Sequence, residues 1–572
     1  MSAAWDRVAF TCNDVPVEVD TAAGESLLSV LRERLGVVSV KDGCAPQGQC
    51  GCCTVLVDDD PRVACVTPAT RVAGRSVTTL EGIDAAERDA LVDAFVASGG
   101  SQCGFCTPGI LVRAAALRAK GRAAPADLDR ALAAHLCRCT GWQTVYESIA
   151  GAGACVGRAA REHAARRAEL EGGVAQEVGE HVPLGDGGFA DDGAPRDALV
   201  AVPLPPGSAA PSVEAAGRRW VVADSLYEAR TLAAKVQGRR TTAELSWPLL
   251  LPQLPDGGVR LLTGWVEPAY LEPDASWCEP GGAPANVLAN GGAFGGKETS
   301  CAPAAARELA DATGRGVRVV FSREDVVRLG PKRPPIAGRA RVEGATVAID
   351  GVVAGDTSPF VGHRRQPYVI EERSVWREQR VAGPSTSSHL RAVGLAERVV
   401  LTEGALSEAG VDRSAVVRDD RVARVLLDTC ACAPSGAMSG ARVELDADGT
   451  LGRVWVRVAA GDPLDEIVLR SYAIGAAHMA LGWVLTEGIA VDSATGEVQD
   501  LTIRSFGVIR AKDTPVIDVD IVDDPGEPRA RSSDAVFASV AAAVWNAISE
   551  QSGVRPERLP ARETAAARRL RR

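Results

Sequence analysis

The stretch KDGCAPQGQCGCCTV, residues 41–55, places four cysteines close together, and one more follows in PRVACV. The spacing C-x5-C-x2-C-x11-C is formed by Cys44, Cys50, Cys53 and Cys65. A plant-type [2Fe–2S] site uses C-x4-C-x2-C and a distant fourth cysteine, so this loop is longer by one residue. Its glycines allow the backbone to turn inward around a cluster. The spacing predicts one [2Fe–2S] cluster, and it leaves the choice between Cys52 and Cys53 open.

A second group, spaced C-x2-C-x30-C-x1-C, consists of Cys103, Cys106, Cys137 and Cys139. Thr107 and the proline after it are typical of a helix start, so a helix is expected to follow Cys106. Further helices are expected over Leu132–Leu136 and from Gln143 onward, running on through Cys155. Helix N-termini pointing at one place favour a negatively charged cluster. This group therefore predicts a second [2Fe–2S] cluster.

Structural zinc and buried free thiols are the alternatives for both groups. Zinc ribbons rarely combine C-x2-C with a C-x-C thirty residues later, which disfavours zinc. Nothing indicates an oxidising compartment, so disulfides are not expected. The net charge of −11 and the pI of about 5.3 make nucleic-acid binding a poor expectation. The first residues lack a secretion signal and no stretch suits a membrane span, so we expect a cytoplasmic protein.

The rest of the chain gives local signals. A hairpin is expected over Val8–Val19, a helix over Ser26–Leu35 and a strand over Thr54–Val57. Trp220–Gln237 reads as a strand followed by a helix capped by Asp224 or Ser225. Further on, helices are expected over 303–313, 471–485 and 534–549, the last taken as the final helix, and a hairpin is expected around Asp448-Gly449.

A family resemblance rests on three segments: KDGCAPQGQCGCCTV, QCGFCTPGI and HLCRCTGWQTVYESI. Residues 1–155 resemble the iron–sulfur module of the molybdenum hydroxylases, the xanthine oxidase and aldehyde oxidase family. The resemblance implies a β-grasp ferredoxin-like domain over 1–78 and a four-helix [2Fe–2S] domain over 79–160. It also implies that the second cluster faces a molybdopterin, with Gln102 and Cys139 at positions that lie against the pterin.

The remaining residues resemble a shortened form of the family's molybdopterin-binding part. We expect an α+β multidomain chain with a linker over 161–200, a small α/β domain over 201–265 and a truncated molybdopterin-binding-type domain over 266–572. NGGAFGGKETS, residues 290–300, resembles the molybdopterin loop, which makes Gly292, Phe294 and Gly295 candidate cofactor contacts. A glycine-rich turn that holds no cofactor is an alternative of equal weight. Arg391 matches an arginine near the family's substrate, although a surface role is the more common reading.

The same loop fits G-x4-G-K, the start of a phosphate-binding P-loop. Glu298 stands where that motif needs a Ser or Thr on Mg²⁺, so ATP binding is disfavoured. His478 lies in an apolar helical stretch, where a histidine is more often packed in a core than a ligand.

The family's catalytic glutamate follows a glycine-rich turn before the last helix. Here that position reads RARSSDAV and Glu527 lies too early, so the general base is expected to be absent. We therefore expect an electron-transfer subunit with no catalytic residue of its own, working with a molybdopterin-containing large subunit and a flavin (FAD) subunit or another acceptor. One alternative is a self-contained small molybdenum hydroxylase with Glu298 or Glu487 as the base. Another is a redox sensor or maturation factor.

Overall fold

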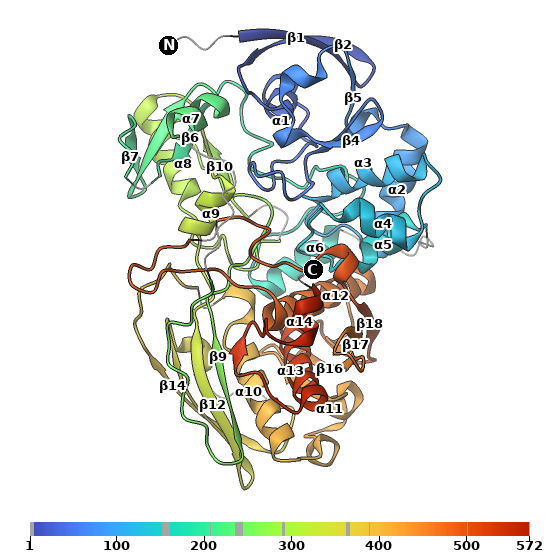
Figure 1. The fold of residues 1–572 in the computed structure, drawn as a ribbon, viewed down its shortest axis with the longest axis vertical. Coiled ribbons are helices and arrows are strands. Elements are labelled where there is room, and N and C mark those ends of the chain that lie inside the picture. The colour runs from blue at the N-terminus through green and yellow to red at the C-terminus, as the bar shows by residue number, and fades with distance from the viewer. Residues whose placement is uncertain are drawn as a thin grey trace.

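The computed structural model describes residues 5–151, 161–205, 207–234, 244–288, 292–361, 366–387, 389–499 and 501–570. Figure 1 shows two tiers. The upper tier holds the amino-terminal cysteine-bearing part on one side and a small sheet with α7, α8 and α9 on the other. The lower tier holds the carboxy-terminal lobe, in which helices lie beside a long sheet. The fold is a mixed helix and sheet arrangement of several domains.

The first sheet begins with the expected hairpin. Strands β1 (Trp5–Cys12) and β2 (Val15–Ala22) pair antiparallel, with Cys12 opposite Val15. The turn residues Asn13 and Asp14 both have positive φ, which suits a tight two-residue hairpin. The sheet is completed in the order β2-β1-β5-β3-β4 by β3 (Thr54–Val57), β4 (Asp60–Val63) and β5 (Ser76–Thr78).

The helix expected over Ser26–Leu35 forms as two short pieces. Ser26 caps α1 (Leu27–Ser29) by accepting a hydrogen bond from the Ser29 N–H, and a π-helical turn, η1 (Val30–Arg34), follows. Short 3₁₀ turns, η2 (Ala64–Val66), η3 (Ala69–Val72) and η4 (Leu80–Gly82), join the strands around it. The buried side chains of α1 and η1 pack in the same core as the first cysteine group.

Four helices carry the second cysteine group: α2 (Ala85–Ser98), α3 (Thr107–Arg118), α4 (Pro125–Leu132) and α5 (Gln143–Ile149). The helix expected over Leu132–Leu136 is wrong, because α4 ends at Leu132. The Leu136 N–H instead donates to the Cys50 carbonyl (2.9 Å), so a hydrogen bond to the first cysteine loop takes the place of a hydrogen bond within the helix. The prediction that the helix from Gln143 runs on past residue 150 is also wrong. Helix α5 ends at Ile149, and Gly151, which has a positive φ, follows it. Cys155 lies outside the described residues.

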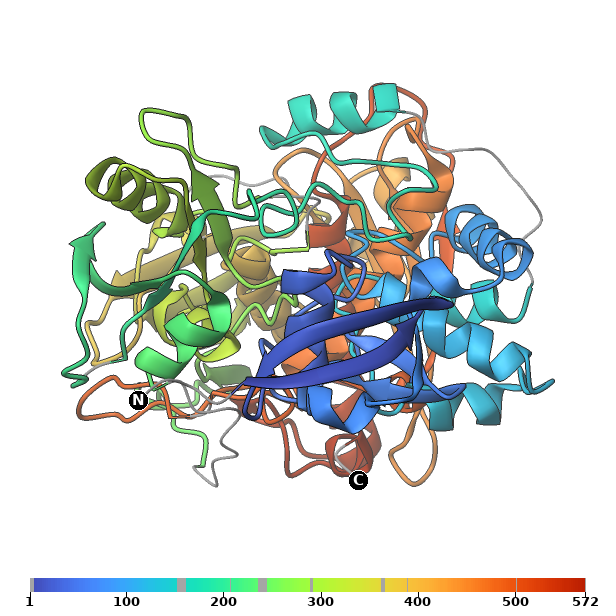
Figure 2. The same ribbon diagram turned by 90° about the horizontal axis from the view of Figure 1, so that it is seen from above.

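The stretch expected as a linker contains one helix, α6 (Arg161–Glu171). After it the chain runs without regular structure to Leu199. In Figure 2 this green-blue segment crosses between the amino-terminal part and the carboxy-terminal lobe. We call residues 172–198 the strap. The strap is packed against the amino-terminal part, because Phe189 is buried and its ring meets the Phe105 ring edge to face, with 5.1 Å between the ring centres.

The small sheet has the order β10-β11-β6-β8-β7. Three of its strands, β6 (Leu199–Pro203), β7 (Val213–Ala215) and β8 (Arg218–Ala223), lie near the expected domain, and helix α7 (Leu226–Leu232) follows with Ser225 as its cap. The other two, β10 (Ala275–Cys278) and β11 (Val317–Val320), come from beyond residue 265. The expected range 201–265 therefore differs from the observed sheet, because long-range pairing of β11 with β6 completes it. Helices α8 (Ala302–Thr313) and α9 (Arg323–Leu329) accompany these strands.

The carboxy-terminal lobe contains two sheets. One has the order β14-β13-β12-β9-β19 and is made of β9 (Gly258–Thr263), β12 (Ile336–Glu343), β13 (Thr346–Val353), β14 (Glu371–Glu378) and β19 (Arg558–Leu559). The other has the order β15-β16-β17-β18 and is made of β15 (Thr429–Cys432), β16 (Met438–Leu445), β17 (Leu451–Ala459) and β18 (Val516–Ile521). The hairpin around Asp448-Gly449 joins β16 and β17, as expected.

The helices of this lobe are α10 (Leu395–Glu408), α11 (Asp420–Val425), α12 (Glu466–Leu485), α13 (Ser532–Ser552) and α14 (Ala565–Leu570). Helix α13 packs against α10, α12 and β16 and lies at the centre of the core. The expected helix 534–549 corresponds to α13. It is not the final helix of the described residues, because α14 follows it. Short 3₁₀ turns are η5 (Ser358–Phe360), η6 (Leu390–Ala392), η7 (Arg413–Val416) and η8 (Ala511–Asp513).

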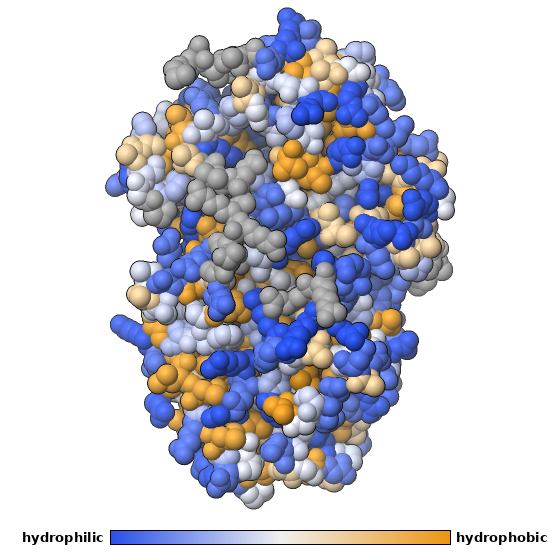
Figure 3. Space-filling model, in the orientation of Figure 1, coloured by the Kyte–Doolittle hydropathy of each residue, from blue (hydrophilic) through white to orange (hydrophobic). Residues whose placement is uncertain are grey.

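Helix α12 is long and apolar enough to cross a membrane, and it is the one helix of the described residues that meets this criterion. Its most apolar window is 78% buried inside the protein, and it packs against α13 and β18. A core helix accounts for these properties. On the face seen in Figure 3, hydrophilic residues dominate and apolar residues form small separate groups rather than a continuous band.

Candidate redox site

The first four predicted cysteine ligands converge in one buried place. Cys44 lies within side-chain contact of Cys50 and Cys65, and Cys65 is also in contact with Cys53. All four thiols are buried and none forms a disulfide. The backbone N–H of Gln47 points at the Cys44 sulfur (3.1 Å), as expected for a loop that wraps a sulfur-bridged cluster.

The position of Cys52 bears on the choice that spacing leaves open. Its thiol contacts Cys50, whereas Cys53 lies beside Cys65 and its sulfur faces the Cys65 N–H (3.4 Å). Cys52 also lies close to Gly43, where a Cβ atom would be 2.9 Å from its sulfur. Cys53, Cys65, Cys44 and Cys50 are joined by successive side-chain contacts, which favours Cys53 as the fourth ligand and leaves Cys52 beside Cys50.

The second four predicted ligands also converge. The sulfurs of Cys103 and Cys139 are 3.5 Å apart, and Cys106 lies within side-chain contact of Cys137. Cys106 is the N-cap of α3, one residue earlier than the expected cap Thr107, so its thiol stands directly at the helix start. The donor chemistry, four cysteine sulfurs in each group with Cys103 alone of the eight partly exposed, fits two [2Fe–2S] clusters.

The two cysteine groups are neighbours. Gly109 on α3 packs so closely on the first loop that a Cβ atom there would lie 2.4 Å from the Gly51 carbonyl. His135 fills the space on the other side of Gly51, and its Nε2 is 3.2 Å from Thr54 Oγ1. Burial lowers the pKa of His135 to about 4, so the ring is neutral near pH 7. The segment between the groups is therefore packed with protein atoms.

Gln102 lies at the second group, as the resemblance implies, but its amide is already engaged. Its Nε2 donates to the Cys139 carbonyl (3.0 Å) and to Ser471 Oγ (2.9 Å) on α12. On the same helix Gly475 approaches so closely that a Cβ atom there would lie 1.8 Å from the Cys139 carbonyl. Helix α12 thus seals one side of Cys139.

The glycine-rich loop seals the other side. Gly292 has positive φ, and a Cβ atom there would lie 3.1 Å from the Cys139 sulfur and 3.2 Å from that of Cys103. Gly295 packs on the backbone of His389, while Phe294 has positive φ and is partly buried against the core. Asn290 and Gly291 lie outside the described residues. The structure therefore brings the three predicted loop residues next to the second cysteine group.

The lysine of this loop is also engaged. Lys297 is buried, its ammonium lies 2.7 Å from a Glu272 carboxylate oxygen and 5.4 Å from the centre of the Tyr270 ring. Helix α8 begins at Ala302, five residues after Lys297, so it does not start at the loop lysine. Because a P-loop needs a lysine free for phosphate and a helix that starts at the loop, this geometry disfavours ATP binding.

The space between Cys139 and the loop decides whether a molybdopterin fits. The cavity there measures about 10 Å³ and is lined by Cys103, Cys106, Arg138, Cys139, Tyr270, Leu271, Glu272, Gly292, Ala293 and Lys297. A single water needs roughly 10–15 Å³, and small-molecule sites commonly measure about 300–1,000 Å³. In the described residues the expected cofactor position is therefore filled by protein, and a pterin does not fit in this arrangement.

Neither carboxylate considered as a base is placed for that task. Arg138 donates from both terminal nitrogens to both oxygens of Glu487, with Nη2 at 2.8 Å, and its Nε donates to the Pro268 carbonyl. Both side chains are at most 2% exposed, so Glu487 is a buried ion-pair partner. Glu298 and Glu527 are exposed. The expected absence of the base at RARSSDAV stays a prediction.

Two further candidates from the sequence are His478 and Arg391. The imidazole of His478 is buried in α12, with Nε2 3.2 Å from the Ile509 carbonyl, which is consistent with a core histidine. The side chain of Arg391 lies outside the described residues. The sequence patterns did not point to Arg138, Ser471 or Gly475, although an arginine between two predicted ligands, at Arg138, was a usable signal.

Comparison with known proteins agrees with this geometry. Residues 10–70 match the 2Fe-2S iron-sulfur cluster binding domain, and residues 79–150 match the [2Fe-2S] binding domain. The chain is 39% identical over 143 residues to the xanthine dehydrogenase iron-sulfur-binding subunit of Escherichia coli O157:H7, covering 24% of this chain and 89% of that protein. It is 43% identical over 139 residues to the aldehyde oxidoreductase of Megalodesulfovibrio gigas, covering 23% of this chain and 15% of that protein.

The likeness of folds extends further than the likeness of sequences. The crystal structure of the aldehyde oxidoreductase from Desulfovibrio gigas superposes with a TM-score of 0.72 at 16% identity, covering 99% of this chain and 100% of that chain. At this identity the match concerns the fold. With two [2Fe–2S] binding domains, and with a relative in this family covered over most of its length, the chain belongs to the molybdenum hydroxylase family of xanthine dehydrogenases and aldehyde oxidoreductases.

Proposed function

We propose that this chain is an electron-transfer protein of the molybdenum hydroxylase family that moves single electrons through two [2Fe–2S] clusters and needs no separate molybdopterin-containing subunit. One observation carries the proposal. Later parts of the same chain pack directly on the second cysteine group, through Gly292 between β10 and α8 on one side of Cys139 and through Gly475 of α12 on the other.

This proposal replaces the expectation of a separate molybdopterin-containing large subunit. A partner cofactor would have to reach Cys139, and that face is covered by helix α12 and by the glycine-rich loop of this chain. The fold likeness to a single-chain aldehyde oxidoreductase over 99% of the chain also supports a self-contained protein. A flavin subunit or another acceptor remains compatible with it, on the side of the first cluster.

Each cysteine group has a role in the proposal. Cys44, Cys50, Cys53 and Cys65 hold one cluster, and Cys103, Cys106, Cys137 and Cys139 hold the other. Iron–sulfur clusters supply reversible one-electron storage when bound. The protein contributes buried thiols, N–H groups aimed at sulfur and close contact between the two loops, which keeps the electron-transfer distance short and excludes water.

A second candidate is that the chain is a complete small molybdenum hydroxylase. The likeness over the whole chain favours it, and so does the convergence of Gln102 and Gly292 at Cys139. The cavity of about 10 Å³ at that place and the engaged Glu487 weigh against it. The metal content of the purified chain separates the two candidates.

The experiment is anaerobic purification of the full chain, reconstitution with iron and sulfide, and measurement of iron and molybdenum per polypeptide. We expect about four iron atoms, two distinct EPR signals after reduction, no molybdenum, and one chain eluting without a larger companion. Stoichiometric molybdenum with bleaching of the clusters by an aldehyde or an N-heterocycle would establish the second candidate instead. A colourless, iron-free chain would refute both.

A further inference from the structure

A hollow beside the first cysteine loop has no role in the function proposed so far. It measures about 250 Å³ and lies where the ferredoxin-like part, the strap and the small sheet meet. Three residues of the cluster loop, Ala45, Pro46 and Gln47, form part of its wall directly after Cys44. A molecule in this hollow would therefore lie beside the first cluster.

Phe105 brings the second cysteine group to the same hollow. Its side chain lines the hollow, and the residue is bonded directly to Cys106. On the side of the first group, a Cβ atom at Gly43 would lie 3.2 Å from the Phe105 ring and 3.2 Å from the Cys50 sulfur. The ring is therefore a neighbour of the first cluster site as well. A molecule in the hollow is thus close to both clusters and can receive electrons from each.

The charged side chains around the hollow balance one another. The wall itself holds two arginines and six acids: Arg32, Arg230, Glu33, Asp42, Asp191, Asp192, Glu272 and Glu324. Four further bases pair with these acids from behind the wall: Lys41, Lys297, Arg318 and Arg328. Six acids against six bases leave no net charge. Each acid has a basic partner within the protein, so the wall offers a ligand no unpaired charge.

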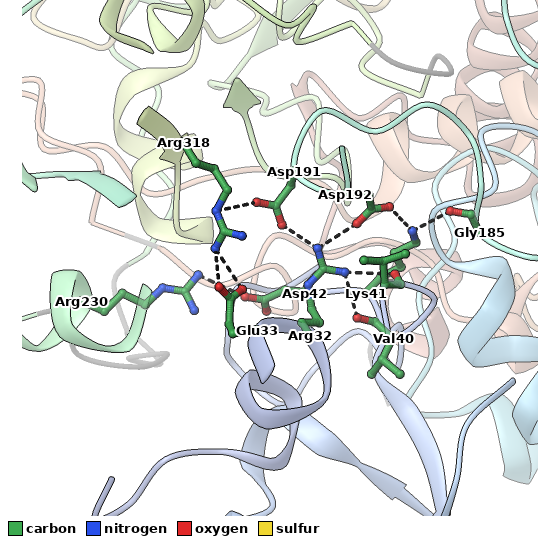
Figure 4. Close-up of polar contacts among 11 residues, drawn as sticks. Arg32, Glu33, Val40, Lys41, Asp42, Gly185, Asp191, Asp192, Arg230 and Arg318 are labelled. Atoms are coloured by element: carbon green, nitrogen blue, oxygen red, sulfur yellow. Dashed lines mark hydrogen bonds and ion pairs between the residues drawn. The ribbon is translucent and has the colours of Figure 1, made fainter. Parts of the chain in front are cut away.

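Figure 4 shows how these pairs tie the three parts of the protein together. Arg32 of the ferredoxin-like part bridges Asp191 (2.7 Å) and Asp192 (2.8 Å) of the strap, and Arg318 of the small sheet reaches Glu33 (2.9 Å). The Arg32 side chain is 7% exposed, so the pairs form a buried frame around the hollow. A charged ligand would have to break one of these pairs or stay unpaired, and both cost free energy.

The remaining wall is mainly apolar and partly aromatic. Its apolar side chains include Leu28, Pro46, Phe105, Phe189, Leu226, Tyr227, Pro273, Val320 and Phe321. Aromatic side chains favour a flat ring as their neighbour. The volume is near the lower end of small-molecule sites, about 300 Å³, which suits a molecule of one or two rings. The hollow therefore selects a small, flat, uncharged molecule.

We propose that this hollow, the quinone pocket, binds an uncharged quinone of one or two rings and reduces it with electrons from the two clusters. The inference rests on the proposed two-cluster function. Each [2Fe–2S] cluster stores one electron, so two reduced clusters hold the two electrons that a quinone takes up. Both clusters return to the oxidised state, the quinone takes two electrons from them and two protons from water, and a hydroquinone leaves.

Other classes of redox carrier fit the quinone pocket less well. Nicotinamide and flavin nucleotides carry phosphate groups, and viologens are cations. The wall has no free charge to pair with either kind, because its acids and bases already pair with one another. A quinone is both uncharged and a two-electron acceptor, which matches the wall and the number of clusters.

Stopped flow on the intact, reconstituted chain tests the quinone pocket. The clusters are reduced with dithionite, the excess is removed anaerobically, and the reduced chain is mixed with 1,4-naphthoquinone. The absorbance of the oxidised clusters should return at a rate that saturates with quinone concentration, and one hydroquinone should form per chain. The uncharged analogue 1,4-dimethoxynaphthalene, which accepts no electrons under these conditions, should compete with the quinone.

Quinones with the same rings and different charges test the neutral wall. 1,4-Naphthoquinone-2-sulfonate carries a negative charge, and a trimethylammoniomethyl naphthoquinone carries a positive one. Each should need an about tenfold higher concentration for half saturation than the uncharged quinone, because its charge finds no partner in the hollow. Half saturation is compared rather than the maximal rate, since the substituents also change the potential of the quinone.

A matched pair of variants on helix α7 locates the site. Thr231 lines the pocket, so Thr231→Trp should fill part of it and turn the saturating rate into one that rises linearly with quinone. The neighbouring Leu232 is 47% exposed and does not line the pocket, so Leu232→Trp should behave as wild type. EPR signals of both clusters after dithionite reduction report that each variant is folded and loaded.

Four results would overturn the quinone pocket: a linear rate in the wild type, no competition by the analogue, equal half saturation for the three quinones, or equal behaviour of the two tryptophan variants. The first three need no variant, so misfolding of Thr231→Trp leaves the test intact. If dithionite gives two cluster signals while these results are negative, the pocket is wrong and the two-cluster function stands. Absence of the clusters would refute the proposed function instead.

Discussion

Breaking the ion pair between Arg138 and Glu487 tests the seam between the second cysteine group and the carboxy-terminal lobe. The change is Glu487→Gln, which keeps the shape of the side chain and removes its charge. Arg138 then remains buried, at 2% side-chain exposure, without its counter-charge. Removing one partner of a buried pair costs about 3–5 kcal/mol, because the other charge is left uncompensated.

The assay is urea unfolding of the reconstituted chain, followed by cluster absorbance and tryptophan fluorescence. With a slope of about 3 kcal/mol per M, that loss lowers the transition midpoint by about 1 M or more. The double variant Arg138→Met with Glu487→Met should recover most of the loss, since replacing both charges with apolar side chains removes the unpaired group. The control is Arg7→Gln, which breaks an ion pair whose side chains are 70% and 51% exposed and should leave the midpoint unchanged.

The same variant has a spectroscopic consequence. Arg138 stands between the ligands Cys137 and Cys139, so its uncompensated charge should stabilise the reduced, more negative second cluster and raise its potential. The first cluster should keep its potential. An unchanged midpoint for Glu487→Gln, or equal shifts of both potentials, would show that the pair neither holds the seam nor acts locally on the second cluster.

Further predictions concern single positions. Gly475→Ala should destabilise the contact with the second cysteine group strongly, because its Cβ would lie 1.8 Å from the Cys139 carbonyl, whereas Gly173→Ala, with no atom within 4 Å, should be neutral in the same urea assay. Cys106→Ser should remove the EPR signal of the second cluster and keep that of the first, and persistence of both signals would refute the ligand set. Burial alone would raise the pKa of Glu267, but the positive charges of Arg323 and Lys332 outweigh burial and hold that pKa below 4.5. The Glu267 carboxylate therefore stabilises the fold above about pH 4.5, and this stabilisation is lost as the pH falls through the lower pKa of the folded state. The wild type should therefore exceed Glu267→Gln in urea midpoint at pH 7, and the difference should shrink at low pH; a constant difference would contradict this.

Parts of the fold that depend on neighbouring residues could be predicted from the sequence. The hairpin of β1 and β2 follows from alternation around Asn13-Asp14, and the cap of α7 follows from Ser225 with Glu228 three residues later. The two cysteine groups were also predictable, because ligand spacing is a local property. The structure brings the cysteines of each set together, and their assignment as cluster ligands stays a prediction.

Features that depend on distant partners were not predictable in this way. The apolar stretch before Cys137 has a helical pattern, yet the Leu136 N–H pairs with Cys50, and this tertiary contact ends α4 early. Arg138 and Glu487 are 349 residues apart, and nothing local in either segment signals the pair. The same holds for the small sheet, whose strand β11 joins β6 from far along the chain.

The seam also explains why the loop resembles a cofactor loop although its described residues border no cofactor-sized space. A loop that approaches a pterin closely needs glycines, and so does a loop that approaches two cysteine sulfurs closely; the two cases share one sequence pattern. The two kinds of loop differ in whether the polar side chains around them are paired within the protein or left free for a ligand. Here Gln102 is satisfied by Ser471, Lys297 by Glu272 and Arg138 by Glu487. Because a pterin site must leave such donors free for its ligand, their internal pairing is the physical reason to assign the lobe a covering role at the second cluster.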